Sequence, residues 1–154
     1  MSQLSKRNAL SLRREWRLFD QDRGSPETYI KLCNRMIEVG EFLLAHDVAR
    51  AGLERHKAHK ELSQRGAHAL CEAGSPKLAT QLLEELVASG GRDVETQSLL
   101  ASAYKDLCEY STSEESKFRY ADLAIARYEE AYNAQVLKSS GKVEDLEKQY
   151  YPCI

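Results

Sequence analysis

The sequence predicts an all-α fold in which antiparallel helix pairs stack into a right-handed superhelix, with a capping helix at the N-terminus. The first observation is an internal repeat, because Gly40 and Gly74, like Ala45 and Ala79, lie 34 residues apart. The second is that apolar residues recur at helical spacing, and matched positions pair small residues with small ones and large residues with large ones. A helical repeat of this length indicates a solenoid, in which each unit buries its apolar face against the next.

Residues 1–24 are predicted to form an amphipathic helix and a linker ahead of the repeats. Ala9, Leu12, Trp16 and Phe19 fall on one face of a helix over residues 4–20, and arginines and lysines flank that face. We interpret this segment as a capping helix that packs on the first repeat. The alternative is a basic amphipathic segment that binds an acidic partner or a membrane surface.

Residues 25–138 are predicted to hold about three helix pairs. Gly40 and Gly74 fit the turn inside each of the first two pairs, because glycine adopts the left-handed conformation that ends a helix without a Cβ clash. Ser25 and Ser75 each precede a proline and are expected to cap the helix that follows. Small side chains are expected where the helices cross most closely, at Cys33, Ala45, Gly52, Ala67 and Ala79.

The third pair departs from the repeat period. We expect its first helix to begin after Asp93, as the N-cap, and to end near Tyr110. The apolar pattern of its second helix resumes 11 residues late, at Ala124, so this helix is expected to be about three turns longer and to run from about 113 to 137. Residues 139–154 are predicted to hold a short helix over 143–150 and the start of a further repeat.

The pattern from Pro26 to Tyr132 resembles the tetratricopeptide repeat (TPR) family in its period, its glycine turns and its small crossing residues. This resemblance implies a TPR-like α-solenoid. The last third is also similar to the TRAF-binding repeat region of apoptosis-signal-regulating kinases and of bacterial repeat proteins, which implies a signalling or scaffold role. The residues that carry this second resemblance are Ala103–Asp106, Ala124–Tyr128 and Tyr151–Ile154.

The TRAF-binding pattern continues into another helix, whereas this sequence has Cys153 in place of a glycine and stops at Ile154. A last half-repeat with an uncovered apolar face is poorly capped. We therefore expect the chain to be a fragment of a longer protein. The alternative is a domain with an unusual end.

Composition excludes several classes of protein. A net charge of −2 argues against a protein that wraps nucleic acid through a basic field. The mean hydropathy of −0.56 and the absence of a long apolar run exclude a membrane span. Four widely separated cysteines and a polar N-terminus favour reduced thiols and a cytoplasmic location.

Motifs for catalysis are absent from the sequence. It has no phosphate-binding glycine loop and no metalloprotease or hydrolase signature. His56 and His59 lack the further converging ligands that a metal site needs, and we interpret them as solvated surface residues. The sequence therefore predicts a protein that is not an enzyme and holds no cofactor and no metal.

In stacked helix pairs the first helices line a concave groove, which is the usual place for peptide ligands. The TPR resemblance places these candidate binding residues there: Asn34 and Glu38 from the first repeat, Arg65, His68 and Glu72 from the second, and Ser102 and Lys105 from the third. It adds Ile30, Ile37, Gln64, Ser98 and Asp106 to the same surface.

The predicted function is a non-catalytic protein–protein interaction module that binds a partner peptide or domain in this groove, in signalling. The alternative is a regulatory or oligomerising segment of a larger multidomain signalling protein. Such a segment would self-associate through its terminal faces, at Tyr151 and Ile154.

Overall fold

The structure, a computed structural model, describes the backbone of residues 3–140 and the side chains of residues 8–21 and 23–137. Within these ranges the regular elements are all helical, which confirms the predicted all-α class. In chain order they are α1 (Gln3–Leu18), the 3-10 turn η1 (Gln21–Arg23), α2 (Pro26–Glu38), α3 (Phe42–Arg55), α4 (Lys60–Glu72), α5 (Pro76–Ala88), α6 (Val94–Tyr110) and α7 (Glu114–Ser140).

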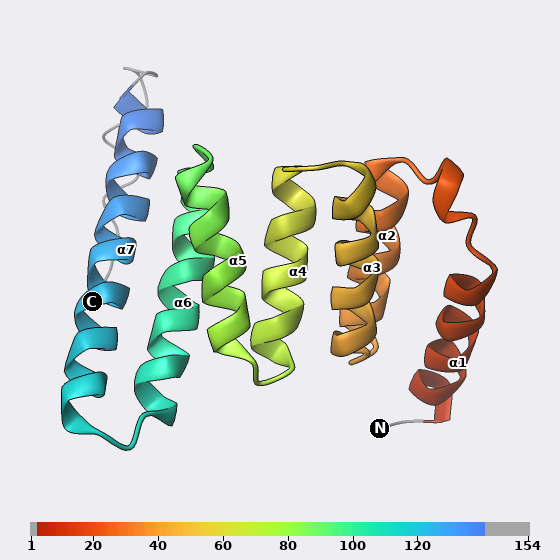
Figure 1. The fold of residues 1–154 in the computed structure, drawn as a ribbon, viewed down its shortest axis with the longest axis horizontal. Coiled ribbons are helices and arrows are strands. Elements are labelled where there is room, and N and C mark those ends of the chain that lie inside the picture. The colour runs from red at the N-terminus through yellow and green to blue at the C-terminus, as the bar shows by residue number, and fades with distance from the viewer. Residues whose placement is uncertain (1–2, 141–154) are drawn as a thin grey trace.

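The helices stand side by side in chain order and form three antiparallel pairs, α2 with α3, α4 with α5, and α6 with α7 (Figure 1). The first helix of each pair also contacts the first helix of the next pair, because α2 packs on α4 and α4 on α6. The second helices α3, α5 and α7 make no comparable contact with one another. The first helices therefore form the inner layer of the solenoid and the second helices form the outer layer.

Glycines shape the turns inside the first two pairs, as the sequence predicts. Gly40 and Gly74 have φ angles of +81° and +74°. In each turn the amide of the following residue donates to a carbonyl in the last turn of the helix, Glu41 to Met36 at 2.9 Å and Ser75 to Leu70 at 2.8 Å. These bonds satisfy carbonyls that the helix itself leaves without a partner.

Helix starts follow the sequence prediction less closely. Ser25 and Ser75 occupy the N-cap positions of α2 and α5, but neither side chain caps its helix, so the predicted serine caps are wrong. The Ser25 hydroxyl instead lies 3.1 Å from the Thr28 hydroxyl. Asp93 does cap α6, because its carboxylate accepts a hydrogen bond from the Thr96 amide.

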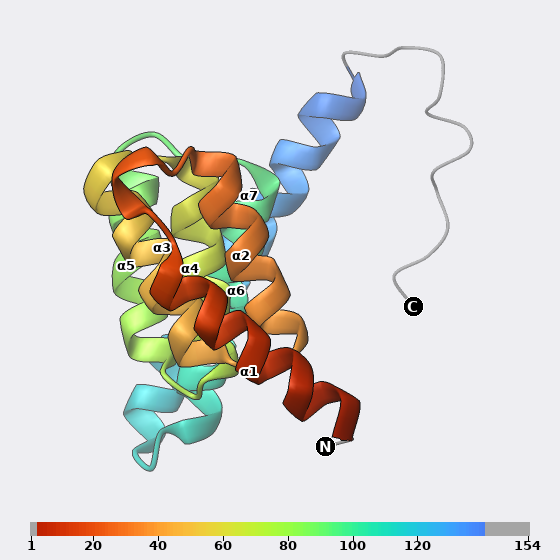
Figure 2. The ribbon, with the colours of Figure 1, turned by 90° about the vertical axis from the view of Figure 1, so that its right-hand side faces the viewer.

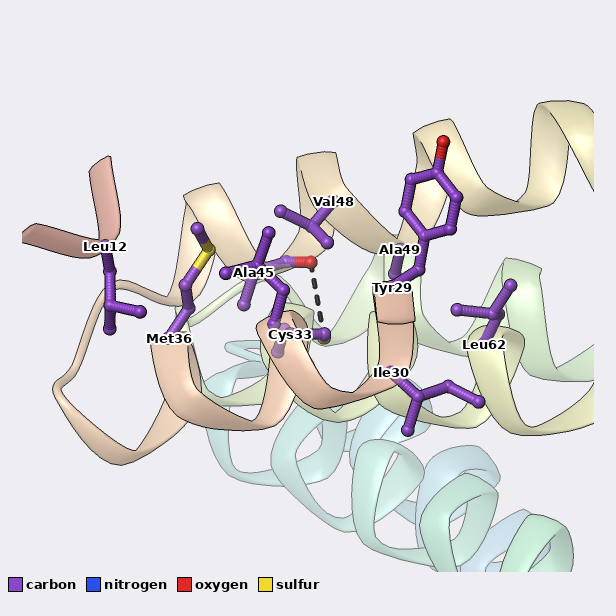
Figure 3. Packing of buried hydrophobic residues seen from close by; sticks show 11 residues of the cluster. Leu12, Tyr29, Ile30, Cys33, Met36, Ala45, Val48, Ala49 and Leu62 are labelled. Atoms are coloured by element: carbon purple, nitrogen blue, oxygen red, sulfur yellow. Dashed lines mark hydrogen bonds between the residues drawn. The ribbon is translucent and has the colours of Figure 1, made fainter. Parts of the chain in front are cut away.

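The first core lies between α2 and α3 and closes against α4 (Figure 3). Cys33 and Ala45 are fully buried where these helices cross, and the Cys33 thiol donates to the Ala45 carbonyl at 3.3 Å. A Cβ added to Gly52 would lie 3.0 Å from atoms of both Leu62 and Tyr29. The glycine predicted at this crossing is therefore required by the tight packing of the side chains around it.

A second core continues from α4 through α5 to α6 and α7. Its buried side chains include Ala67, Ala79, Leu83, Leu100, Tyr104 and Ala124. Ala79 is fully buried at the crossing where the repeat alignment predicts a small residue. The two cores share α4, so the repeats form one continuous apolar interior.

The ends of the described chain are formed by α1 and α7. α1 buries Ala9 and Leu12 and packs on α2, as expected for a capping helix. α7 begins at Glu114 and ends at Ser140, so it is a long helix, as predicted, and projects beyond its neighbours (Figure 2). The short helix predicted over 143–150 lies outside the described residues.

Candidate functional site

The predicted groove residues all belong to the inner-layer helices α2, α4 and α6. Their side chains are accessible, unlike those of the core: Asn34, Arg65, His68 and Ser102 are half-buried, while Glu38, Glu72 and Lys105 are exposed. Asn34, His68 and Ser102 occupy equivalent positions of the three repeats, and so do Glu38, Glu72 and Asp106. The inner layer thus presents two rows of polar side chains. Tyr151 and Ile154, the predicted terminal interface, lie outside the described residues.

Arg65 lies at the centre of this surface and connects two repeats. Its guanidinium is 3.8 Å from the carboxylate of Glu61 on α4 and 3.8 Å from that of Glu95 on α6. The side chain is 27% exposed, and its buried Nε has no hydrogen-bond partner. A guanidinium held in place at long ion-pair distances keeps donors available for a ligand carboxylate or carbonyl.

Acidic side chains gather next to Arg65, toward the C-terminal ends of α4 and α6. Burial raises the pKa of Asp106; Lys105 opposes this shift, while the carboxylates of Glu109 and Glu72 add to it. Glu72 also lies 3.6 Å from Nε2 of His68. This part of the surface is therefore negative, whereas the Arg65 part combines one guanidinium with the carboxylates of Glu61 and Glu95.

Two of the additional groove positions are corrected by the structure. Ile30 is only 8% exposed and belongs to the first core, and Gln64 is only 4% exposed. The Gln64 amide donates to the Thr96 hydroxyl at 2.9 Å and to the Asp93 carboxylate at 3.2 Å. Both residues hold repeats together rather than face a ligand.

Ser102 is directed toward the end of the solenoid. Its hydroxyl lies 3.3 Å from the hydroxyl of Tyr128 on α7. Tyr128 is 44% exposed, so the pair lies at the surface where α6 and α7 meet. Ser102 therefore borders the groove at its C-terminal margin.

Sequence reasoning did not find a cavity of about 270 Å³ in the outer layer, between α3 and α5 and above α4. Gly66 and Leu70 of α4 line it from below, and His46 and Leu82 line it from the sides. A Cβ on Gly66 would lie 3.2 Å from that of Ala49. A glycine inside a predicted helix was the available signal, because it marks a close approach.

The expectation that His56 is a solvated surface residue is wrong. Its Nε2 lies 2.9 Å from the Gly24 carbonyl, and its ring contacts Tyr29 edge-on, so it ties α3 to the segment before α2. Among the described residues, no group of histidine, cysteine and acidic side chains is arranged to hold a metal ion. The described part of the chain also contains no helix with the length and apolar character needed to cross a membrane.

A match to a solved structure with a TM-score of 0.51 supports the solenoid fold. The chain matches "MamA 41-end from Desulfovibrio magneticus RS-1" with a TM-score of 0.51, 20% sequence identity and coverage of 99% of both chains. It also matches "MamA RS-1 ArsTM double mutant" with a TM-score of 0.46 and 15% identity, over 91% of this chain and 99% of that one. No curated protein matches the sequence significantly.

A family model settles the classification that the repeats and the fold indicate. The model described as TPR-S, Tetratricopeptide Repeats-Sensor, matches residues 3–154, which is almost the whole chain. TPR-type repeat proteins are generally non-catalytic modules that bind other proteins. The protein belongs to the TPR-S family of tetratricopeptide repeat proteins.

Proposed function

We propose that this protein is a non-catalytic interaction module in signalling, which binds a segment of a partner protein along the inner surface of α2, α4 and α6. The observation that carries this proposal is the pair of polar rows at equivalent positions of the three repeats, with Arg65 about one turn of α4 before them. Polar side chains in rows along a groove can hydrogen-bond the backbone and side chains of a bound peptide. The family description, which calls these repeats a sensor, supports a role in recognition.

The charges of the surface suggest the chemistry of the partner. Arg65 favours a carbonyl or carboxylate, and the acidic group of Glu72 and Asp106 favours one basic side chain. We therefore propose a partner segment with charges of both signs. A strongly acidic or strongly basic segment would be repelled by one part of the surface.

The experiment compares partners recovered by the full-length protein from its native cells. The groove variant combines Asn34→Ala, Arg65→Ala, His68→Ala and Lys105→Ala. A matched outer-layer variant combines Arg50→Ala, Lys77→Ala and Gln81→Ala, which are exposed on α3 and α5. Circular dichroism and thermal unfolding establish that both variants remain folded.

We expect a partner that is retained by the wild-type protein and the outer-layer variant but lost from the groove variant. Titration of that purified partner then measures the contribution of Arg65 alone, and a central hot spot costs about 2 kcal/mol or more in binding. Equal recovery by the groove variant and the wild-type protein would contradict the proposed groove. Loss from the outer-layer variant alone would move the binding surface to the cavity above Gly66.

A second candidate is a regulatory or oligomerising segment of a larger signalling protein, in line with the resemblance to TRAF-binding repeats. The observation that favours it is the exposed apolar surface of α7, where Phe118 is 69% and Tyr132 is 64% exposed. Apolar surface of this kind marks an interaction site when it is continuous. Self-association without a groove partner would favour this candidate.

A further inference from the structure

The outer face of α7 carries a regular stripe of apolar and acidic side chains. Its members are Phe118, Asp122, Ile125, Glu129 and Tyr132, separated by four and three residues in turn. This spacing puts them on one side of a helix, as in a coiled-coil seam. Phe118, Ile125 and Tyr132 are 69%, 57% and 64% exposed, and both carboxylates are exposed as well.

The opposite side of α7 accounts for its packing within the chain. Ala124 and Ala131 are buried at 6% exposure each, and Tyr120 stacks on Tyr104 of α6 with ring centroids 6.3 Å apart. The stripe therefore adds nothing to the contact between α7 and α6. Apolar side chains that stay in water at helical spacing have the pattern of a face that packs against another helix.

A complementary face occurs on α1. Leu10, Arg14, Arg17 and Leu18 lie on one side of this helix, and Leu10 and Leu18 are 65% and 74% exposed. The side of α1 that packs on α2 is the other one, which holds Ala9 and Leu12. The outer face of α1 is thus apolar and basic, whereas the outer face of α7 is apolar and acidic.

The charges on these two faces are not used within the fold. Arg14, Arg17, Asp122 and Glu129 take part in no ion pair with any described residue. Their neighbours behave differently, and the pairs that they form within the chain are Arg13 with Glu41 at 2.7 Å, Arg35 with Glu15 at 2.6 Å, and Arg127 with Glu130 at 3.0 Å. The unpaired charges are opposite in sign on α1 and α7.

The positions of α1 and α7 decide whether their outer faces can meet within one chain or only between two copies. α1 lies at one end of the solenoid and α7 at the other, with all other helices between them (Figure 1). One chain cannot close this distance without unfolding. We propose that the outer face of α7 packs against the outer face of α1 of a second copy of this protein, in a head-to-tail contact.

The face on α1 is shorter than the stripe on α7. At the helical rise per residue, Leu10 to Leu18 span about 12 Å and Phe118 to Tyr132 span about 21 Å. In the contact, the long side chains of Arg14 and Arg17 lie between Asp122 and Glu129 and reach toward them, while the two leucines cover part of the apolar stripe. Because a head-to-tail contact uses different surfaces on the two copies, it is repeatable and joins more than two copies, in a ring or in a filament.

The test is sedimentation velocity of the 154-residue chain over a wide range of protein concentration. The wild-type protein is expected to sediment faster as its concentration rises, and less so at high salt because the charges are screened. Two charge-reversed variants are compared with it. The first is Arg14→Glu with Arg17→Glu, and the second is Asp122→Arg with Glu129→Arg.

Each reversed variant alone is expected to weaken self-association at least about tenfold, because like charges then face each other. A mixture of the two variants restores association, since each reversed face meets a partner of opposite sign. The control is Lys57→Glu with Arg92→Glu, which changes the net charge as the first variant does but lies on neither helix. It is expected to associate like the wild-type protein.

Three results would overturn the proposal. One is a wild-type protein that sediments as a monomer at every concentration. Another is association that persists unchanged in either reversed variant. The third is a lower stability of the isolated monomer in Asp122→Arg with Glu129→Arg. The occupant of the α7 face would then be residues 141–154 of the same chain.

Discussion

The buried amide of Gln64 on α4 donates a hydrogen bond to the hydroxyl of Thr96 on α6 at 2.9 Å, and so joins the second repeat to the third. Both residues lie in the interior, at 4% and 0% exposure. Most of the contact between repeats is apolar. Apolar contact holds the repeats together but does little to fix the alignment of one repeat on the next. A buried polar pair adds a penalty for any shift between the repeats, because a buried donor without an acceptor is costly.

We predict that Thr96→Val destabilises the protein although it preserves the shape of the side chain. The Gln64 amide then keeps only the Asp93 carboxylate, at 3.2 Å, and Asp93 loses the hydrogen bond that the Thr96 hydroxyl donates at 3.0 Å. We expect these losses to cost about 1–3 kcal/mol in the free energy of unfolding. The double variant Gln64→Leu with Thr96→Val removes the Gln64 donor as well, so its loss of stability is expected to be smaller than the sum of the losses of the two single variants. Urea unfolding of the wild-type protein and these variants measures this difference, and additive losses would contradict it.

Asp93 is predicted to stabilise the start of α6 through its charge as well as its cap. Burial raises its pKa, but hydrogen bonds from Thr96 and the charge of Lys60, 3.5 Å away, outweigh burial and lower the pKa below the ordinary 3.8. A lowered pKa in the folded state gives stability that is present above pH 3.8 and is lost as the pH falls through the folded pKa.

Asp93→Ala is therefore expected to cost about 1 kcal/mol at neutral pH, as the loss of a helix cap does. Part of that cost should disappear in acid, where the wild-type carboxylate is protonated. Asp93→Asn keeps an acceptor and should lose only the part that depends on pH. Thermal unfolding across an acidic pH series measures both effects, and a constant difference at every pH would refute the role of the charge.

Ala79 tests the alignment of the repeats. It is fully buried at a helix crossing, so Ala79→Leu overpacks the interior and is expected to cost about 1–3 kcal/mol. The control is Ala88→Leu, which makes the same change at an exposed position of the same helix. An equal melting temperature for the two variants would show that the repeat register is wrong.

Most of the fold was predictable because its signals are local and repeated. Gly40 and Gly74 mark turns that depend only on backbone conformation, and Ala45 and Ala79 mark crossings that recur in each repeat. The serine caps were not predictable in the same way. A side-chain cap requires one rotamer, and the hydroxyl of Ser25 has Thr28 as a competing partner.

The candidate site was predictable to the level of a helix face and no further. The repeat period places Arg65 and His68 on the inner layer, but it also places Gln64 there, one residue from Arg65. A rotation of about 100° per residue separates a buried position from an accessible one. Only the packing of α6 on α4 decides which side chain is enclosed, and this packing depends on contacts that are distant in the sequence.

Tyr104 and Glu84 give a last prediction, on the behaviour of the protein in base. The hydroxyl of Tyr104 on α6 donates to the carboxylate of Glu84 on α5, and its ring is nearly buried. Burial and the nearby Glu84 raise the pKa of Tyr104 well above the ordinary 10.0. A raised pKa means that the folded state holds the neutral phenol, so this stabilisation is present below pH 10.0 and is lost as the pH rises through the folded pKa.

Ultraviolet titration should therefore detect two tyrosines that ionise only after the exposed tyrosines have done so. They are Tyr104 and the fully buried Tyr29, whose pKa burial also raises, and Tyr104→Phe should remove one of these two late steps. The same variant is expected to cost about 0.5–1.5 kcal/mol at neutral pH, the net value of one hydrogen bond, and to be less sensitive than the wild-type protein to unfolding above pH 10.0. Tyr110→Phe is the control, because Tyr110 is 63% exposed. If Tyr104→Phe leaves the number of late-ionising tyrosines unchanged, the raised pKa does not belong to Tyr104, and the prediction is wrong.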